Sequence, residues 1–334
     1  MKADEADKLE NDADNSMESS GSKSSSEIAD IIDALSQRKE LYQSYSDELS
    51  QNGETQKSLT DPDSRLMMSD GKLDVCYNVQ SSVDSKNKMI VHFDVINTAQ
   101  DKNQLPPMAV ASAEMLGVKN LNATADKGYN AVSDIVMCIA QGITPHVAGC
   151  DYDVCLPVDL DVPKELVLNE VTAQNITGHV NGLSVYLPDR NIVICPMGQT
   201  LYPSTYKKSK GKAFFRNGRA CSSCKCKCTK ERYKAFEISM PKADFTKEFN
   251  DKNLDVKQVR LTARKDIVAQ RKSIAEHPFG TIKRNMNAEY LLTKGIDNVG
   301  GELFLAFLSY NFKRAINILG ARYLIEAMGK RCEA

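Results

Sequence analysis

The sequence lacks features that define several classes of protein, and each absence narrows what the chain can be. Its 334 residues contain no stretch approaching the 18 uninterrupted apolar residues that predict a membrane-spanning helix. The first thirty residues are polar and lack the apolar segment of a secretory signal. We therefore expect a cytoplasmic protein that does not enter a membrane.

Short catalytic motifs are also missing. The four histidines show neither H-E-x-x-H nor any other paired spacing of a metalloenzyme. No G-x-S-x-G, Walker or G-x-G-x-x-G pattern is present. Serine hydrolases, nucleotide-hydrolysing enzymes and dinucleotide-dependent enzymes are therefore disfavoured.

Acidic and basic residues are present in nearly equal number but are unevenly distributed. Residues 1–70 carry 7 basic and 17 acidic side chains, a net charge of −10, and residues 71–200 carry a net charge of −6. Residues 201–334 carry 28 basic and 13 acidic side chains, a net charge of +15. This strongly basic C-terminal part predicts a polyanion such as nucleic acid as a partner. A Lys-rich surface that faces only solvent would give the same excess of basic residues.

Hydrophobic spacing predicts an α/β fold in four parts. Residues 1–60 are acidic, disordered at first and helical over 25–50. Residues 61–150 predict a hairpin over 72–97, a helix closed by Gly117, a strand over 120–125, a helix from 130 and a strand near 143, together a mixed sheet. Residues 151–250 predict an inserted β-rich subdomain with a Cys cluster. Residues 251–334, helical from about 255, would complete the core, with an apolar helix near 300–320 packed on it.

The cysteines suggest a metal site. Cys221 and Cys224 have C-x-x-C spacing, Cys228 follows four positions later, and Cys195 offers a fourth ligand from a neighbouring strand. Structural zinc takes four such ligands. In a chain without an export signal, reduced thiols are the main alternative and disulfides are the least favoured.

A basic segment surrounds the Cys cluster. Residues 201–230 hold nine Lys or Arg and no acidic residue, with four aromatic residues interleaved: Tyr202, Tyr206, Phe214 and Phe215. This composition predicts contact with phosphates and some stacking on bases.

Two carboxylates stand out by position. Asp126 follows the strand over 120–125, at the strand end where ligand sites form in α/β sheets, and nearby Gly128 allows close approach. It suits a divalent cation or the N-cap of the next helix. Glu276 lies among four basic residues and suits an ion-pair network or a metal ligand whose neighbours hold a nucleic acid: Arg271, Lys272, Lys283 and Arg284. Pro278 predicts a kink or helix end just after Glu276.

Seven segments together resemble motifs of bacterial insertion-sequence transposases of the DDE type. They are DPDSRLM (61–67), CYNVQSSVD (76–84), ADKGY (125–129), CPMGQ (195–199), CSSCKCKCT (221–229), EHPFGTIKR (276–284) and LSYNFKR (308–314). The resemblance implies a ribonuclease H-like mixed sheet with flanking helices, and two-metal cleavage and strand transfer of DNA with Mg²⁺ or Mn²⁺. It identifies Asp126 and Glu276 as catalytic metal ligands, the basic residues near Glu276 as DNA contacts, and transposon ends and target DNA as partners. A homodimer, with a second copy of the chain as partner, is compatible with the resemblance.

The sequence departs from this family at its start. The family's first catalytic Asp lies on the first core strand, and no apolar strand precedes residue 60. We therefore expect a transposase truncated at its N-terminus and inactive as this chain. Asp61, Asp63 and Asp84 are candidates for a substitute ligand. The alternatives are a non-catalytic DNA-binding remnant and a zinc-dependent nucleic-acid-binding protein.

Overall fold

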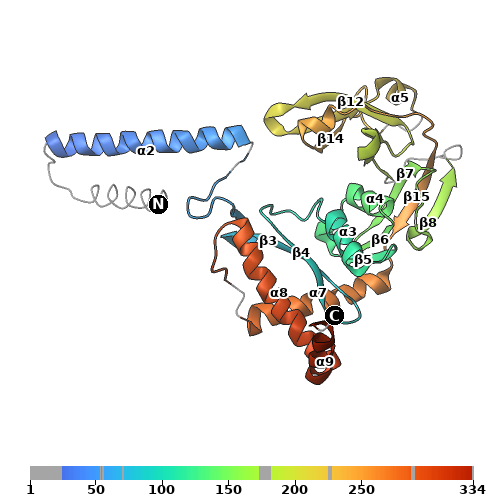
Figure 1. Ribbon diagram of the computed structural model, residues 1–334. Helices are drawn as coiled ribbons and strands as arrows, with labels where there is room; N and C mark the ends of the chain where they lie inside the picture. The colour runs from blue at the N-terminus through green and yellow to red at the C-terminus, as the bar shows by residue number, and fades with distance from the viewer. Residues whose placement is uncertain are drawn as a thin grey trace. The chain divides into compact units, whose positions relative to one another are not determined.

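The computed structural model describes residues 25–52, 54, 56–69, 71–172, 182–224, 228–286 and 290–332. The segment 1–24, predicted to be disordered, lies outside these residues. The chain divides into two units (Figure 1). The first unit contains Met1–Val79, Val95–Ala99 and Asn287–Leu308, and the second contains Gln80–Asp94, Gln100–Met286 and Ser309–Ala334.

A long helix and a hairpin belong to the first unit. Helix α2 (Ser25–Asn52) confirms the predicted N-terminal helix. Strands β1 (Arg65–Ser69) and β2 (Lys72–Cys76) pair antiparallel. The sequence alternates from Leu73 to Val79 as if in one strand, but the chain forms two. The ladder with β1 ends at Cys76, because its partner Arg65 is the first residue of β1.

Two aspartates of this unit bind the start of helix α8 (Ile296–Leu319). Asp61 accepts hydrogen bonds from the Tyr77 hydroxyl at 2.8 Å and from the Gly295 amide at 3.2 Å. Asp63 accepts one from the Ile296 amide at 3.0 Å. The first amides of a helix lack partners within it, so these carboxylates satisfy them. The structure thus gives both residues a structural role.

Strands β3 (Asn78–Val83) and β4 (Ile90–Ile96) form the second hairpin. The Asp84 amide donates to the Met89 carbonyl at 2.8 Å, and the Asp84 carboxylate accepts from the Asn87 amide at 2.6 Å. The third candidate for a substitute metal ligand therefore holds a turn. The predicted pairing of these two segments is confirmed.

A parallel strand pair with a helical crossover forms part of the second unit. Strands β5 (Leu121–Ala125) and β6 (Ile143–Val147) pair in parallel and are connected through helix α4 (Val132–Ala140). Helix α3 (Leu105–Leu116) lies beside α4 and these strands in Figure 1 and ends at Gly117, whose φ of 64° is left-handed. These elements match the predictions. Within the described residues, however, β3–β4 and β5–β6 are separate two-stranded sheets and not one continuous mixed sheet.

Residues 151–262 contribute most of the remaining β structure. A four-stranded sheet has the order β8-β15-β7-β9. Its strands are β7 (Asp151–Pro157), β8 (Val167–Thr172), β9 (Gly182–Leu183) and β15 (Val256–Thr262). The prediction that helix resumes at about residue 255 was wrong. Residues 256–262 pair antiparallel with both β7 and β8, and the ladder on each side overrides the local preference.

A five-stranded antiparallel sheet carries the Cys-containing segment. Its strands are β10 (Val185–Leu187), β11 (Ile192–Ile194), β12 (Thr200–Lys207), β13 (Lys212–Arg216) and β14 (Phe236–Ser239). Two short helices, α5 (Gly218–Ser223) and α6 (Lys242–Phe245), accompany it. The short 3₁₀ turns are η1 (Lys127–Tyr129), η2 (Lys164–Leu166), η4 (Pro188–Arg190) and η5 (Lys208–Lys210).

Strands β10 and β11 separate two apolar clusters because successive side chains point to opposite faces. Val185 and Ile194 join the main core with residues of α4, β6, β7 and β15. Tyr186 and Val193 pack in a second cluster around the fully buried Phe215. Each fully buried large side chain contributes roughly 1.5–3 kcal/mol to folding. The five-stranded sheet is therefore anchored on one face to the core that carries β5 and β6.

Helix α7 (Lys265–Asn285) does not end just after Glu276, which was one of the two outcomes that Pro278 predicted. The helix continues through the proline for two further turns. A proline removes one backbone hydrogen bond, but Ile274, Pro278 and Ile282 are spaced four residues apart and all three are buried. Burial of this stripe offsets the lost bond.

Helices α8 and α9 (Ala321–Cys332) end the chain. Helix α8 buries Val299 and Leu303, yet Phe304, Leu305 and Leu308 are each more than half exposed. That this apolar helix packs on the core of the second unit stays a prediction. In the described part of the chain, no helix is long and apolar enough to cross a membrane.

His146 on β6 gives a pH-dependent prediction. Its ring is fully buried, its Nδ1 accepts from the Arg264 amide at 3.3 Å, and its Nε2 lies 3.2 Å from Asn122 Oδ1. Burial lowers the pKa of His146 below 6.5, and the positive charge of Arg264 lowers it further. Folding favours the neutral ring, so its contribution to stability is complete above pH 6.5 and decreases as the pH falls below that value.

Urea unfolding of the wild type and His146→Gln between pH 7.5 and pH 5 would measure this contribution. We expect the free energy of unfolding to fall more steeply with decreasing pH in the wild type than in the variant. Equal slopes would contradict the assignment.

Candidate active site

Asp126 lies where strand β5 ends and η1 begins. Its backbone is extended, and its Oδ1 accepts a hydrogen bond from the Gly128 amide at 2.8 Å. The side chain is half-buried. The capping role that the sequence left open is therefore present. Capping uses one carboxylate oxygen for one amide, so it does not exclude metal ligation.

A second carboxylate, Asp101, converges on the same point. A Cβ atom added to Gly128 would lie 2.8 Å from Asp101 Oδ2 and 3.0 Å from Asp126 Oδ1, so these two oxygens are separated by less than the sum of those distances. Gln80 donates from Nε2 to Asp101 Oδ1 at 3.0 Å. Sequence reasoning missed Asp101. Asp101 comes five residues after the end of strand β4, whereas Asp126 directly follows β5, so the local sequence gave no clear signal for it.

Tyr129 connects this acidic pair to helix α7. Its hydroxyl donates to Gln80 Oε1. Burial raises the pKa of Tyr129, the charges of Asp101 and Asp126 raise it further, and Arg271 opposes them. The phenol therefore stays protonated at neutral pH and orients the Gln80 amide, which in turn donates to Asp101. The charge of Arg271, on helix α7, acts on Tyr129 in the direction opposite to the two carboxylates.

Glu276 is paired with Arg271 on the same helix α7, with Arg271 Nη2 3.9 Å from Glu276 Oε1. The Glu276 side chain is 60% exposed and that of Arg271 only 23%. The ion pair thus involves Arg271, although the helical spacing had placed Lys272 beside Glu276. The other basic residues predicted to bind DNA, Lys272, Lys283 and Arg284, are exposed.

The described residues do not contain a complete metal-binding set. No group of three or more His, Cys, Asp or Glu side chains in this part of the chain is arranged to hold a metal ion. The structure brings Asp101 and Asp126 together over Gly128 and pairs Glu276 with Arg271. That Asp126 and Glu276 share one metal site stays a prediction.

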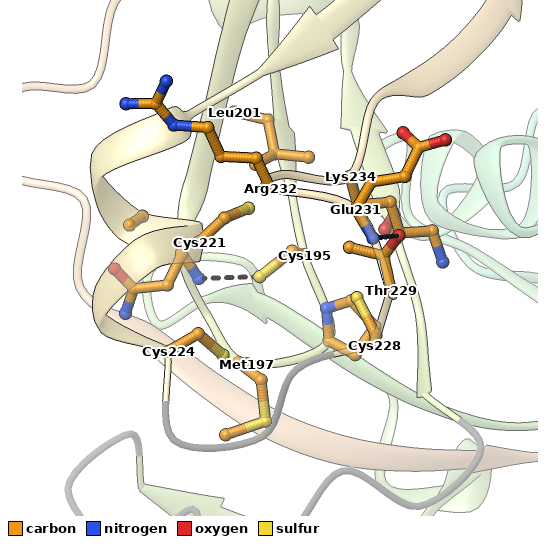
Figure 2. Close-up of a pocket in the computed structure, with 14 residues that line it drawn as sticks. Cys195, Met197, Leu201, Cys221, Cys224, Cys228, Thr229, Glu231, Arg232 and Lys234 are labelled. Carbon is orange, nitrogen blue, oxygen red and sulfur yellow. Dashed lines mark hydrogen bonds between the residues drawn. The ribbon is translucent and has the colours of Figure 1, made fainter.

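Four cysteines identified from the sequence line one small pocket (Figure 2): Cys195, Cys221, Cys224 and Cys228. Cys195, Cys221 and Cys228 are free thiols. Burial raises the pKa of Cys195, backbone hydrogen bonds lower it, and the neighbouring Cys224 and Cys221 raise it. Cys195, just after a neighbouring strand, thus lines the same pocket as the C-x-x-C pair, and its role as a fourth zinc ligand stays a prediction.

A broad surface hollow of about 920 Å³ lies beside this pocket. It is lined by Arg216, Arg219, Arg232, Tyr202 and Tyr233, together with small polar residues. The Arg216 guanidinium lies over the Tyr233 ring, 5.5 Å from its centroid, and donates to the Tyr233 hydroxyl at 2.9 Å. Arginines beside partly exposed aromatic rings suit a nucleic-acid strand, since phosphates bind the charges and bases stack on the rings.

The predicted stacking role fits only some of the aromatic residues. Phe215 is fully buried in the second apolar cluster and is not available to a base. Phe214 lies under the Lys207 ammonium, 5.1 Å from the ring centroid. Strand β13 explains this outcome, because Phe214 and Phe215 are adjacent and must face opposite sides of the sheet.

Comparison with known protein families gives a match. The family described as a transposase DDE domain matches residues 194–316. Over these residues the chain is similar to DDE-type transposases. The match begins beside Cys195, includes the remaining pocket cysteines and Glu276, and ends within α8. It confirms the resemblance over this range, and Asp126 lies outside it. Comparison with curated proteins and with solved structures gives no match.

Gly128 offers a sensitive test of the acidic pair in this transposase relative. In Gly128→Ala, the new methyl group would overlap the two carboxylate oxygens and displace them. Both are ends of flexible side chains, so we expect the free energy of unfolding to change by less than about 1 kcal/mol. We expect Mn²⁺ affinity, measured by water proton relaxation, to fall by about 10- to 100-fold, because ligand placement governs metal affinity.

Gly300→Ala is the matched control, since a Cβ at Gly300 in helix α8 meets no atom within 4 Å. Undiminished Mn²⁺ affinity in Gly128→Ala would show that the acidic pair does not bind the ion.

Proposed function

We propose that this chain is a DDE-type transposase that cleaves DNA at the ends of an insertion sequence and joins it to a target, using Mg²⁺ or Mn²⁺. Asp126 and Glu276 would be its catalytic carboxylates. The observation that best supports the proposal is the convergence of Asp126 and Asp101 over Gly128, at the carboxyl end of β5. The parallel β5–α4–β6 unit and the β3–β4 hairpin fit a ribonuclease H-like core.

The residues fit a divalent cation in donor chemistry. Carboxylate oxygens are the ligands that Mg²⁺ prefers, and Asp126, Asp101 and Glu276 supply them. When bound, such ions would polarise the scissile phosphate and activate the attacking oxygen. Gln80 and Tyr129 keep Asp101 oriented through their hydrogen bonds. Arg271 holds Glu276, and the exposed basic residues of α7 would neutralise phosphates of the bound strand.

We further propose the domain organisation that this function implies. Residues 61–150 and 251–334 would form the ribonuclease H-like core, and residues 151–250 a β-rich insertion. Its Arg- and Tyr-lined hollow would hold DNA outside the catalytic site.

The charge distribution favours a second function, that of a protein that binds DNA without cutting it. Such a protein would occupy transposon ends through its basic C-terminal half, whose net charge is +15.

The decisive experiment offers the chain DNA fragments from either side of its own gene, with Mg²⁺, Mn²⁺ or EDTA. Strand nicking, and joining of the fragment to a supercoiled plasmid, that require the cation would support the transposase. Salt-sensitive binding that is unchanged by EDTA and yields no cut strands would support the non-catalytic function. Equal affinity for DNA of any origin would contradict recognition of transposon ends.

A further inference from the structure

The pocket that contains Cys195, Cys221, Cys224 and Cys228 has a function separate from the carboxylates. It measures about 40 Å³, which admits an ion or one or two water molecules and excludes a nucleotide or sugar. Its four thiols come from two places in the chain, the β11–β12 turn and the segment around α5. Figure 2 shows Cys221, Cys224 and Cys228 grouped around Cys195.

The turn that carries Cys195 is rigidly held. The Cys195 amide donates to the Gln199 carbonyl at 2.9 Å, and the Gly198 amide donates to the Cys195 carbonyl at 2.8 Å. The Gln199 amide points at the Cys195 sulfur, 3.4 Å away. Such N–H···S bonds stabilise a thiolate and fix its direction toward a ligand.

The same turn is also held by contacts with strands β7 and β9. Cys155, fully buried in β7, donates from its thiol to the Pro196 carbonyl at 3.2 Å. A Cβ added to Gly182 would lie only 2.6 Å from Pro196 Cβ, so only glycine permits this close approach. Cys155 thus supports the turn and is not a member of the pocket.

The segment with the C-x-x-C pair is fixed over the turn by its own contacts. Asn217 caps α5 by accepting from the Ala220 amide at 3.0 Å, and its Nδ2 donates to the Thr200 carbonyl at 2.8 Å. Cys221 lies within α5, and Cys224 follows its last residue. The Asn217 side chain therefore joins helix α5, at which the C-x-x-C pair lies, to strand β12, which follows Cys195.

We propose that these four cysteines bind one zinc ion in a closed, structural tetrathiolate site. On binding, each thiol loses its proton to solvent and forms one Zn–S bond, so that four protons are released and the site carries a net charge of −2. Arg232 and Lys234, which also line the pocket, provide compensating positive charge. In the described structure no three of these sulfurs already surround a common point. Rotation about χ1 redirects each thiol, which allows the set to close around an ion.

The ion would hold the basic segment in place. Arg219 lies between the Asn217 cap and Cys221, and Arg232 lies four residues after Cys228. Both also line the neighbouring hollow. Zinc would therefore fix the positions of the arginines that face a nucleic acid, although the ion itself would not contact the nucleic acid. This inference does not rest on the proposed carboxylate chemistry, because its ligands and its metal are different.

Metal analysis of the full chain purified without chelators tests the proposal. We expect about one zinc per chain, released by a mercurial reagent and detected with a chromogenic chelator. Apo protein reloaded with Co²⁺ should show the thiolate-to-metal absorption and visible bands of a tetrahedral tetrathiolate site. Cys195→Ser and Cys221→Ser should weaken zinc binding by more than about 100-fold. Cys195→His should keep the ion but shift the Co²⁺ spectrum to that of three thiolates and one imidazole.

Cys226→Ser is the matched control, because Cys226 belongs to the same short segment but not to the proposed ligand set. It should retain one zinc and the unchanged Co²⁺ spectrum. Zinc lost in Cys226→Ser but retained in Cys228→Ser would overturn the ligand assignment. Wild-type protein that contains no zinc and gives no Co²⁺ thiolate absorption would overturn the site itself, whatever the DNA assays show.

Discussion

Asp126→Asn is expected to reduce metal-dependent DNA cleavage by more than about 100-fold while leaving the chain folded. The amide oxygen of Asn can still accept the hydrogen bond from the Gly128 amide, because Asn and Asp are equally good N-caps. It lacks the negative charge that binds a divalent cation. We therefore expect the free energy of unfolding to change by less than about 0.5 kcal/mol. The variant separates the two roles that the position of Asp126 allows.

The measurement pairs a nicking assay in Mn²⁺ with urea unfolding of the same preparations. Glu276→Gln should show the same loss of cleavage, and Asp161→Asn, which alters an exposed aspartate of the same unit, should show none. If the wild-type chain does not cut DNA, Mn²⁺ binding replaces cleavage as the readout. Asp126→Asn and Glu276→Gln should then bind Mn²⁺ less tightly than the wild type, and Asp161→Asn should bind it equally well. Full Mn²⁺ affinity in Asp126→Asn would leave Asp126 a capping residue alone.

DNA binding should depend steeply on salt. If six or more phosphates are neutralised, raising the salt from about 50 to about 200 mM should lower affinity by about 10³-fold or more. Replacing Lys272, Lys283 and Arg284 by Gln should reduce the slope of log K against log salt by roughly 3, because each phosphate contact contributes about 0.9. These three residues are exposed on α7, so their loss should not unfold the chain.

The matched control replaces three exposed lysines outside the basic part, Lys39, Lys72 and Lys119, by Gln. It removes the same charge and should leave the slope within about one unit of the wild type. Equal changes in both triple variants would mean that net charge, and not the α7 surface, governs binding. Adding Arg271→Gln should reduce affinity further and also release Glu276 from its ion pair.

Local sequence patterns predicted much of the fold. The apolar spacing of α2, the Gly117 that closes α3, and the succession of β5, α4 and β6 all match, because each depends on side chains a few residues apart. The sequence also named Cys195 together with the distant C-x-x-C segment, and these residues line one pocket, while their sharing of a zinc ion stays a proposal. The family relationship was evident from motif order, and the match over residues 194–316 confirms it.

Only tertiary structure decided the remaining features. Residues 256–262 form a strand because β7 and β8 supply a ladder on each side, and Pro278 stays within α7 because its ring is buried with Ile274 and Ile282. Phe215 is buried because the sheet presents that face to Tyr186 and Phe245. Asp101 meets Asp126 over Gly128 through loops that no local pattern specifies. The sequence by itself determined which residues carry charge and thiols. Their meeting points were decided by packing between distant segments, which local spacing does not encode.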